Sequence, residues 1–584
     1  MKAFRFLLIL LPLLLLFGCS ETEGTEPPST TPPPQVCTVT LKPGIGTLQG
    51  TTLVTVSGTR VTLPTPTVTD TRYRFLGWSQ DGGAPVTSLV VEADVTLQAV
   101  WSSVTSSDFS YTETADGLTL IGYHGSASKL QIPDTVNDQP VKALGARLFA
   151  EQHTLTEITV PDSVQVLGAE VFAGCTALRQ VTLPTGLTAL PDRAFFGCTA
   201  LTAISLPDTL TACGDACFAG CTALTSVQLP DGLSALGAHA FANCTALQAL
   251  SFGQQLSVLP YGMALGCTQL SVLSLPERLT AVSAFALSRT ALTSLVLPNG
   301  VRTVGDFALA DCNALTSVTL SADLTALGNR ALAGCDSLAQ IHTAGAPLTA
   351  IGDYAFADCA ALTSLTLPNT LRTLGVSALA GCVSLTELTL PFVGAHPLDG
   401  HTFGYLFDKQ SHPLSAEING ADGLFFLPRS LVTVHVTGTR LPVGAFAGCY
   451  TLQTVTLAEG LQVIPQNAFE GCGSLTAVSL PQTLTTIGNR AFAACVSLLE
   501  IRLPARLCAL ADDSFAGCVR MTTLYADCAL IAAEIGTRAL CKQVLVLYLS
   551  NEITATLGSG APDGYTRASR QDTLLYTKFS KNLG

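Results

Sequence analysis

A repeat of 23 residues constrains this chain more than any other feature. From residue 149 onward the sequence follows the pattern LxxVxLPxxLxxLGxxAFxxCxx, and three consecutive units begin at Leu178, Leu201 and Leu224. Self-similarity at such a period is the signature of a solenoid, in which each unit buries its apolar residues against its neighbours. The cysteine of the pattern recurs at positions 175, 198, 221, 244, 267, 312, 335, 359, 382, 449, 472, 495 and 518.

The spacing within one unit predicts how each coil is built. In LxxVxL, the Val and the final Leu face inward and the residue between them faces outward. The Pro ends the strand because it cannot donate to a sheet. The repeated Cys is expected to be a small buried hydrophobe, since stacked thiols that point the same way are poorly placed for disulfides. Gln152 heads this cysteine series, and Arg289 takes the place of the Cys missing between 267 and 312.

The repeat resembles the BspA-like subclass of leucine-rich repeats, and the segment from Phe109 to Gly125 resembles the first repeat of that family. The resemblance implies a β-rich leucine-rich-repeat solenoid with a parallel sheet on one face. We place the solenoid at residues 107–530, with an irregular insertion at about 392–428, and a C-terminal cap and tail at 531–584. Relatives in this family are implicated in attachment to host matrix proteins and to other bacteria.

The N-terminus predicts export and a lipid anchor. Lys2 and Arg5 precede an apolar run from Phe6 to Phe17, which is shorter than the roughly 20 residues that span a bilayer. The run ends in Leu16-Phe17-Gly18-Cys19, which resembles the lipobox of bacterial lipoproteins and implies that Cys19 carries the lipid. We therefore predict a lipoprotein signal peptide at 1–18 and a Pro/Thr/Glu-rich tether at 19–35. An ordinary secretory signal remains the alternative.

Residues 36–103 predict a small β module that precedes the solenoid. Polar and apolar residues alternate in 38–41, 52–56 and 95–101, which is the period of half-buried strands. The opening TVTL, a central FLGW and a closing LQAVW resemble the internalin B-repeat, which implies a β-grasp-like domain. Trp78 and Trp101 are interpreted as core anchors, with sugar stacking as the alternative.

No catalytic motif emerges from the sequence. It contains no HExxH, GxSxG, P-loop or GxGxxG pattern. The insertion holds His396, His401 and His412, with Asp399 and Asp408 nearby, but their spacing matches no metal motif. We interpret the insertion as a surface loop packed by its aromatic residues Phe403, Tyr405 and Phe407.

The cysteines outside the regular series have structural interpretations. Cys213 and Cys217 replace a Leu and an Ala of the pattern, so we interpret them as core substitutions; a metal site with Cys221 is the alternative. Cys508, Cys528 and Cys541 leave open a disulfide near the C-terminal end. The structural interpretation of these cysteines and the lack of catalytic motifs together predict that the chain is not an enzyme and needs no cofactor or metal.

The outer face of the parallel sheet is the candidate binding surface. Solenoids present long faces of this kind to extended partners, although Ser and Thr also suit a merely solvated sheet. A net charge of −13 and the lack of any Lys/Arg block argue against nucleic acid. The candidate residues are Thr159, Thr182, Ser205, Gln228, Ser251, Ser274, Thr319, His342, Thr366, Thr389, His435, Thr456, Ser479 and Arg502.

These features predict an adhesin-like monomer, lipid-anchored in the bacterial envelope and exposed on the outer membrane. Its expected partners are proteins or glycans of host or bacterial surfaces. A periplasmic or envelope scaffold without an external ligand is the second hypothesis. A hydrolase that acts through the insertion is the third and the least favoured.

Overall fold

The computed structural model describes residues 35–67, 73–80, 83–103, 108–343, 345–409, 412–420 and 423–526, together with the backbone of three strands beyond residue 545. The chain divides into two compact units, Met1–Val104 and Thr105–Gly584. The predictions for the signal peptide, for Cys19 and for Cys528 and Cys541 lie outside the described residues. No helix in the described part of the chain is long and apolar enough to cross a bilayer.

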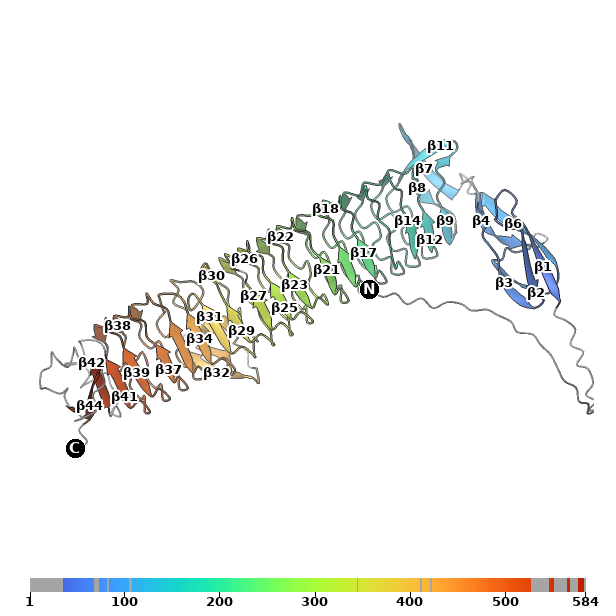
Figure 1. The fold of residues 1–584 in the computed structure, drawn as a ribbon. Helices are drawn as coiled ribbons and strands as arrows, with labels where there is room; N and C mark the ends of the chain where they lie inside the picture. The colour runs from blue at the N-terminus through green and yellow to red at the C-terminus, as the bar shows by residue number, and fades with distance from the viewer. Residues whose placement is uncertain are drawn as a thin grey trace, which may run out of the picture. The chain divides into compact units, whose positions relative to one another are not determined.

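The N-terminal unit is built on a mixed four-stranded sheet with the order β2-β1-β6-β4 (Figure 1). Its central strands β1 and β6 run parallel, and the outer strands β2 and β4 pair with them antiparallel. Strands β3 and β5 form a separate antiparallel pair. The bounds are β1 (Val36–Lys42), β2 (Thr52–Val56), β3 (Thr59–Thr62), β4 (Tyr73–Ser79), β5 (Ser88–Val91) and β6 (Val95–Ser103).

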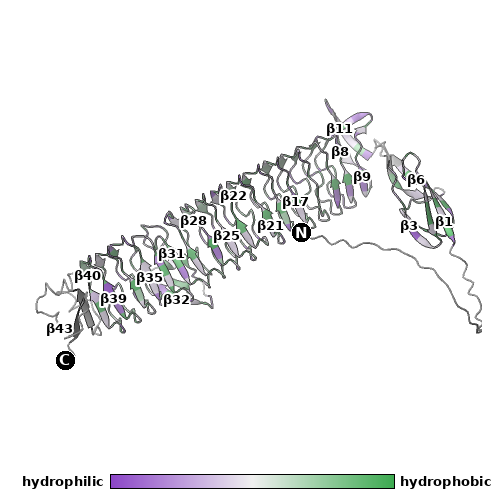
Figure 2. Cartoon of the chain, viewed as in Figure 1, coloured by the Kyte–Doolittle hydropathy of each residue, from purple (hydrophilic) through white to green (hydrophobic). Residues whose placement is uncertain are grey.

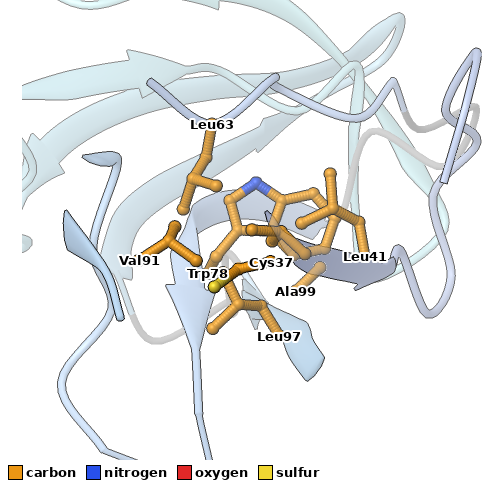
Figure 3. Close-up of a cluster of buried hydrophobic side chains, with 8 residues drawn as sticks. Cys37, Leu41, Leu63, Trp78, Val91, Leu97 and Ala99 are labelled. Carbon is orange, nitrogen blue, oxygen red and sulfur yellow. The ribbon is translucent and has the colours of Figure 1, made fainter. Parts of the chain in front are cut away.

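Trp78 lies at the centre of this unit's core, as predicted (Figure 3). Its indole is fully buried, and its Nε1 donates a hydrogen bond of 2.7 Å to the carbonyl oxygen of Pro64. Trp101 is only half buried, and its Nε1 donates to the Pro43 carbonyl oxygen at 3.0 Å. Phe75 packs edge-on between the two indoles, with ring centroids 5.5 Å from each.

The second unit is a solenoid whose first parallel sheet is made by the LxxVxL segments (Figure 1). Successive strands pair in register, so that Ser226, Ala249 and Val272 are direct partners. In most coils the inward Val and Leu are buried and the residue between them is not, as predicted; in a few coils the inward residues are half-buried, as at Leu273 and Val478. The strands are β9 (Lys129–Gln131), β12 (Glu157–Thr159), β14 (Gln180–Thr182), β17 (Ser226–Gln228), β19 (Ala249–Ser251), β21 (Val272–Ser274), β23 (Ser294–Val296), β25 (Ser317–Thr319), β27 (Gln340–His342), β29 (Ser364–Thr366), β31 (Glu387–Leu390), β34 (Thr433–Val436), β35 (Thr454–Leu457), β37 (Ala477–Ser479), β39 (Glu500–Leu503) and β41 (Thr523–Ala526).

A second parallel ladder, which was not predicted from the repeat pattern, runs along the LxxLG segments. Each coil contributes only two residues to it. The following glycine lets neighbouring coils approach, since a Cβ at Gly237 would lie 2.3 Å from the backbone nitrogen of Asp215. The strands are β13 (Val166–Leu167), β15 (Ala189–Leu190), β16 (Ala212–Cys213), β18 (Ala235–Leu236), β20 (Val258–Leu259), β22 (Ala281–Val282), β24 (Thr303–Val304), β26 (Ala326–Leu327), β28 (Ala350–Ile351), β30 (Thr373–Leu374), β36 (Val463–Ile464), β38 (Thr486–Ile487) and β40 (Ala509–Leu510).

Mixed sheets that contain antiparallel pairs close the solenoid at both ends. At the start, β7 (Phe109–Thr114), β8 (Gly117–Tyr123), β10 (Thr135–Val136) and β11 (Gln139–Leu144) form a sheet in the order β10-β11-β8-β7. At the end, β42 (Val546–Ser550) pairs parallel with β41, and β44 (Tyr576–Lys581) and β43 (Tyr565–Arg567) follow antiparallel. Such caps pair the backbone groups that an open solenoid end would expose.

The Ala-Phe corner of each coil stacks phenylalanine rings along the solenoid. Neighbouring rings lie 5.1–5.6 Å apart and within 15° of parallel in two runs. Between the runs, Leu287, Leu309 and Leu332 occupy the same buried position. The stacked residues are Phe149, Phe172, Phe195, Phe218 and Phe241 in the first run and Phe446, Phe469, Phe492 and Phe515 in the second.

The repeated cysteines are free and buried, as predicted, and most of their thiols also donate a hydrogen bond to the preceding coil. The Cys221 thiol donates to the Phe195 carbonyl oxygen at 3.1 Å, and Cys244 donates to that of Phe218 at the same distance. We call this row the cysteine ladder. Members that donate in this way are Cys175, Cys198, Cys221, Cys244, Cys267, Cys312, Cys335, Cys359, Cys382, Cys472, Cys495 and Cys518, at 3.0–3.3 Å.

The prediction that Arg289 fills the place of the missing cysteine is wrong. Thr290 occupies it: the residue is 4% exposed, its Oγ1 donates to the Leu287 carbonyl at 3.0 Å, and the Cys312 sulfur lies 3.3 Å away. Arg289 is exposed and has a φ of 60°, like the residue before each ladder cysteine. The coil is one residue short after Thr290: Leu292 follows Thr290 by two residues, whereas Leu270 follows Cys267 by three.

The insertion extends one coil of the solenoid, which takes 46 residues from Leu385 to Leu431 (431 − 385). Strands β31 and β34 still pair directly across it. The 3-10 helix η2 (Phe403–Leu406) supplies the Phe corner, where the Phe403 backbone N–H donates to Ala445 at 2.8 Å. The hairpin β32 (Ser415–Gly420) and β33 (Gly423–Pro428) follows. The interpretation of the insertion as a surface loop is therefore wrong: Phe403 and Phe407 are buried and Tyr405 is half-buried, so the insertion packs into the core.

Candidate binding surface

The outer face of the first sheet carries the candidate residues in one line. None of them is buried, and Ser251, Thr319, Thr389, His435 and Thr456 are half-buried while the others are exposed. Ser205 belongs to this line although residues 201–207 form no regular strand. Figure 2 shows that the strands of this sheet carry both hydrophobic and hydrophilic residues. The face is therefore accessible; its role in binding stays a prediction.

One polar cluster stands out on this face. Thr389, His435 and Thr456 are direct partners in the adjacent strands β31, β34 and β35. The His435 Nε2 lies 3.0 Å from a Glu387 carboxylate oxygen, and its Nδ1 is hydrogen-bonded to the Thr456 hydroxyl. Both ring nitrogens are thereby engaged within the face, so His435 is held in one orientation.

Aromatic side chains form a second, partly exposed row, which was not predicted from the sequence. We define the aromatic row as His239, Tyr261, Phe285, Phe307 and Tyr354. Successive rings in the first four lie 5.1, 5.6 and 4.7 Å apart, and the Arg330 guanidinium lies between the last two, 5.9 and 4.4 Å from their centroids. Most members of the aromatic row stand at the repeat position directly before the Ala of the Ala-Phe corner. Aligning the repeats and comparing the residues at that position would have revealed the row.

The three histidines of the insertion do not form a cluster. His401 Nδ1 lies 2.7 Å from the Asp399 carboxylate, whereas His396 and His412 each accept a hydrogen bond from a nearby backbone N–H, of Leu398 and Leu414. Partial burial raises the pKa of Asp399, but the Ala395 N–H and His401 outweigh it, so the net shift is downward.

His401 of this pair lines a pocket of about 280 Å³ that is also lined by Ser377, Tyr405 and Lys409. An imidazole oriented by a carboxylate can act as a general base. The Ser377 hydroxyl, however, donates to the Phe407 carbonyl at 3.3 Å.

Cys213, Cys217 and Cys221 are all buried within the coils. Burial raises the pKa of Cys221 to about 12, so the neutral thiol is strongly favoured there. Within the described residues, no three His, Cys, Asp or Glu side chains are placed to hold a metal ion. Cys508 is exposed, and its thiol donates to the Thr485 carbonyl at 3.4 Å.

A family model described as the BspA type leucine rich repeat region matches the chain. The matches cover residues 142–271, 189–296, 280–405 and 430–543, which together make up more than half of the 584 residues. No curated protein matches the chain.

Solved structures of bacterial leucine-rich repeat proteins are similar to this chain. One from T. pallidum is 29% identical, with 30% of this chain and 84% of that chain covered and a TM-score of 0.30. One from Bacteroides ovatus is 21% identical, with 72% and 93% covered and a TM-score of 0.35. A leucine rich cell surface protein from Faecalibacterium prausnitzii is 21% identical, with 64% and 93% covered and a TM-score of 0.34.

Proposed function

The chain belongs to the BspA-type leucine-rich repeat family, and from this premise we propose that it is a lipid-anchored surface protein that binds macromolecules of host or bacterial surfaces. The solenoid is a fold that typically serves as a non-enzymatic scaffold for interactions with proteins or other ligands. The observation that carries the proposal is the outer sheet face, a continuous and accessible line of mostly small polar residues from Thr159 to Arg502.

The expected anchor supports a location on the bacterial envelope. The Leu16–Cys19 segment resembles a lipobox, and the polar stretch that follows suits an extended tether. A lipid on Cys19 would hold the N-terminus at the membrane while the solenoid remains available to external partners. We further propose that the chain acts as a monomer without cofactor or catalytic activity.

Protease treatment of intact cells tests the location. The wild-type protein should be cut by added protease, and a Cys19→Ala variant should appear in the medium rather than on the cells. A protected wild-type chain, in a culture where a known surface protein is cut, would favour the periplasmic scaffold instead.

Binding of the purified protein to immobilised host matrix tests the surface. Gln228→Arg, Ser251→Arg and Ser274→Arg together place three long cations on adjacent strands of the outer face. We expect this triple variant to lose binding, because the bulky side chains hold a partner off the sheet. A double variant, Phe285→Ser and Phe307→Ser, serves as the comparison. If this variant loses binding and the triple variant does not, the partner contacts the aromatic row and not the outer sheet face.

A further inference from the structure

A pocket of about 320 Å³ opens where three parallel strands of the first sheet end. Asn369 follows β29, Pro391 follows β31 and Thr437 follows β34, and these strands are neighbours in the sheet. The pocket thus depends on the extended coil, whose segment after β31 provides one wall. It lies on the turn edge of the solenoid, apart from the outer sheet face.

The pocket is held in shape by contacts between coils. The Thr437 backbone N–H donates to the Leu390 carbonyl at 2.9 Å, and the Thr437 hydroxyl donates to Asn369 Oδ1, which lies 68 residues earlier in the chain. Residue 438 must be glycine, because a Cβ there would lie 1.8 Å from the Pro391 carbonyl oxygen. A site fixed in this way loses little conformational entropy when a ligand enters.

Two arginines line the pocket without a counter-charge. Arg372 and Arg440 are both exposed, no acidic residue lines the pocket, and no described residue forms an ion pair or hydrogen bond with either guanidinium. Arg147, Arg193 and Arg490 instead pair with glutamates on neighbouring coils. In a chain of net charge −13, two unpaired cations around one small cavity favour an anion between them.

The remaining walls define the rest of the ligand. Leu371, Phe392 and Pro397 supply apolar surface, and Thr437, Thr439 and Asn369 supply hydroxyl and amide groups. The volume lies at the lower end of the roughly 300–1,000 Å³ of small-molecule sites, which suits one compact ring. A guanidinium fork matches the planar geometry of a carboxylate.

We propose that this pocket binds an acidic monosaccharide unit, a uronic or sialic acid. Its carboxylate lies between Arg372 and Arg440, its ring rests against Phe392 and Pro397, and its hydroxyl groups bond to the threonines. This site would give the chain a defined specificity for a small ligand. The proposal does not depend on whether the outer sheet face binds a macromolecule.

Ligand-observed NMR and calorimetry on the purified full-length protein test the proposal. The probes are sodium glucuronate and N-acetylneuraminate, with glucose as the neutral sugar, sodium sulfate as a simple anion and glycylglycine as a peptide carboxylate. We expect at least one sugar acid to bind more tightly than all three comparison probes. Failure of both sugar acids to bind, or equal binding of sulfate or of glycylglycine, would overturn the assignment.

Matched variants locate the binding. Arg372→Gln and Arg440→Gln should each weaken sugar-acid binding about tenfold or more, since each removes one charged fork. Arg372→Lys should weaken it less, because the charge remains. Arg302→Gln is the control: Arg302 is exposed at the equivalent position of an earlier coil, where its backbone N–H makes the same 2.8 Å bond to the preceding coil. Circular dichroism confirms that each variant is folded, and unchanged affinity in folded Arg372→Gln and Arg440→Gln refutes the site.

Discussion

The cysteine ladder should make the solenoid unstable at alkaline pH. Burial raises the pKa of Cys175, Cys221 and Cys382 to about 12, against an ordinary thiol value of 9.0. The neutral thiol is the form that the folded state retains. The stabilisation is complete below the unfolded-state pKa of 9.0 and is lost as the pH rises toward 12, because only the unfolded chain can then release its protons.

The size of the effect follows from these values. At pH 10 the unfolded state gains about 1.4 kcal/mol for each such thiol, because pH 10 is one unit above the ordinary pKa and two units below the raised one. The three thiols together therefore remove about 4 kcal/mol, a large share of the roughly 5–15 kcal/mol of a typical domain. Burial also raises the pKa of Cys359 and Cys449, which act in the same direction.

Urea unfolding at pH 7 and pH 10, followed by circular dichroism in reducing buffer, measures this loss. A Cys221→Ala and Cys382→Ala double variant has two fewer thiols to ionise. Between pH 7 and pH 10, it should lose about 3 kcal/mol less unfolding free energy than the wild type. Cys508→Ala, a substitution at the exposed cysteine, is the matched comparison variant. An equal loss in the wild type and the double variant would refute the role of the buried thiols.

Three further outcomes follow from the coil geometry. Brief alkylation of the native protein at pH 8, mapped by mass spectrometry, should modify Cys508 and spare Cys221, whereas labelling of both before unfolding would contradict the burial. Phe218→Ala should cost about 3–5 kcal/mol in urea unfolding, because the ring is fully buried and stacked on both sides. Phe218→Leu should cost clearly less, since Leu occupies this position in other coils; equal costs would argue against a specific fit. Arg289→Gly should stabilise the solenoid by about 1 kcal/mol, because its φ of 60° favours glycine; a destabilised variant in the same assay would show that the arginine makes a stabilising contact.

The repeat made most of the solenoid predictable. A position that is apolar in every unit must face the interior, so the inward Val and Leu and the ladder cysteines could be placed without coordinates. The second ladder was missed because each coil contributes only two residues to it, too few for an alternating pattern. Thr290 was missed because a coil one residue short can be aligned in two ways, and only the buried hydrogen bonds to Leu287 and Cys312 decide between them.

The candidate surfaces were less predictable, for a physical reason. The outer face follows from the strand period, so its residues could be named in advance. The aromatic row and the arginine pocket join side chains from neighbouring coils that are variable within the repeat. Arg372 and Arg440 are 68 residues apart (440 − 372), and the parallel pairing of β29, β31 and β34 brings their backbone segments to one edge.

Because each coil pairs its strands with those of the coils on either side, the 23-residue unit is also a unit that recombination in the gene can add or remove. Recombination between similar repeats in the gene would remove or add whole coils, and the new neighbours would still meet in register. Loss of residues 201–223, for example, would join Ala200 to Leu224, which begins the next unit. Each such event changes the reach of the protein by one strand spacing, about 4.8 Å. The arginine pocket, confined to coils much later in the chain, would pass unchanged through these variations in length.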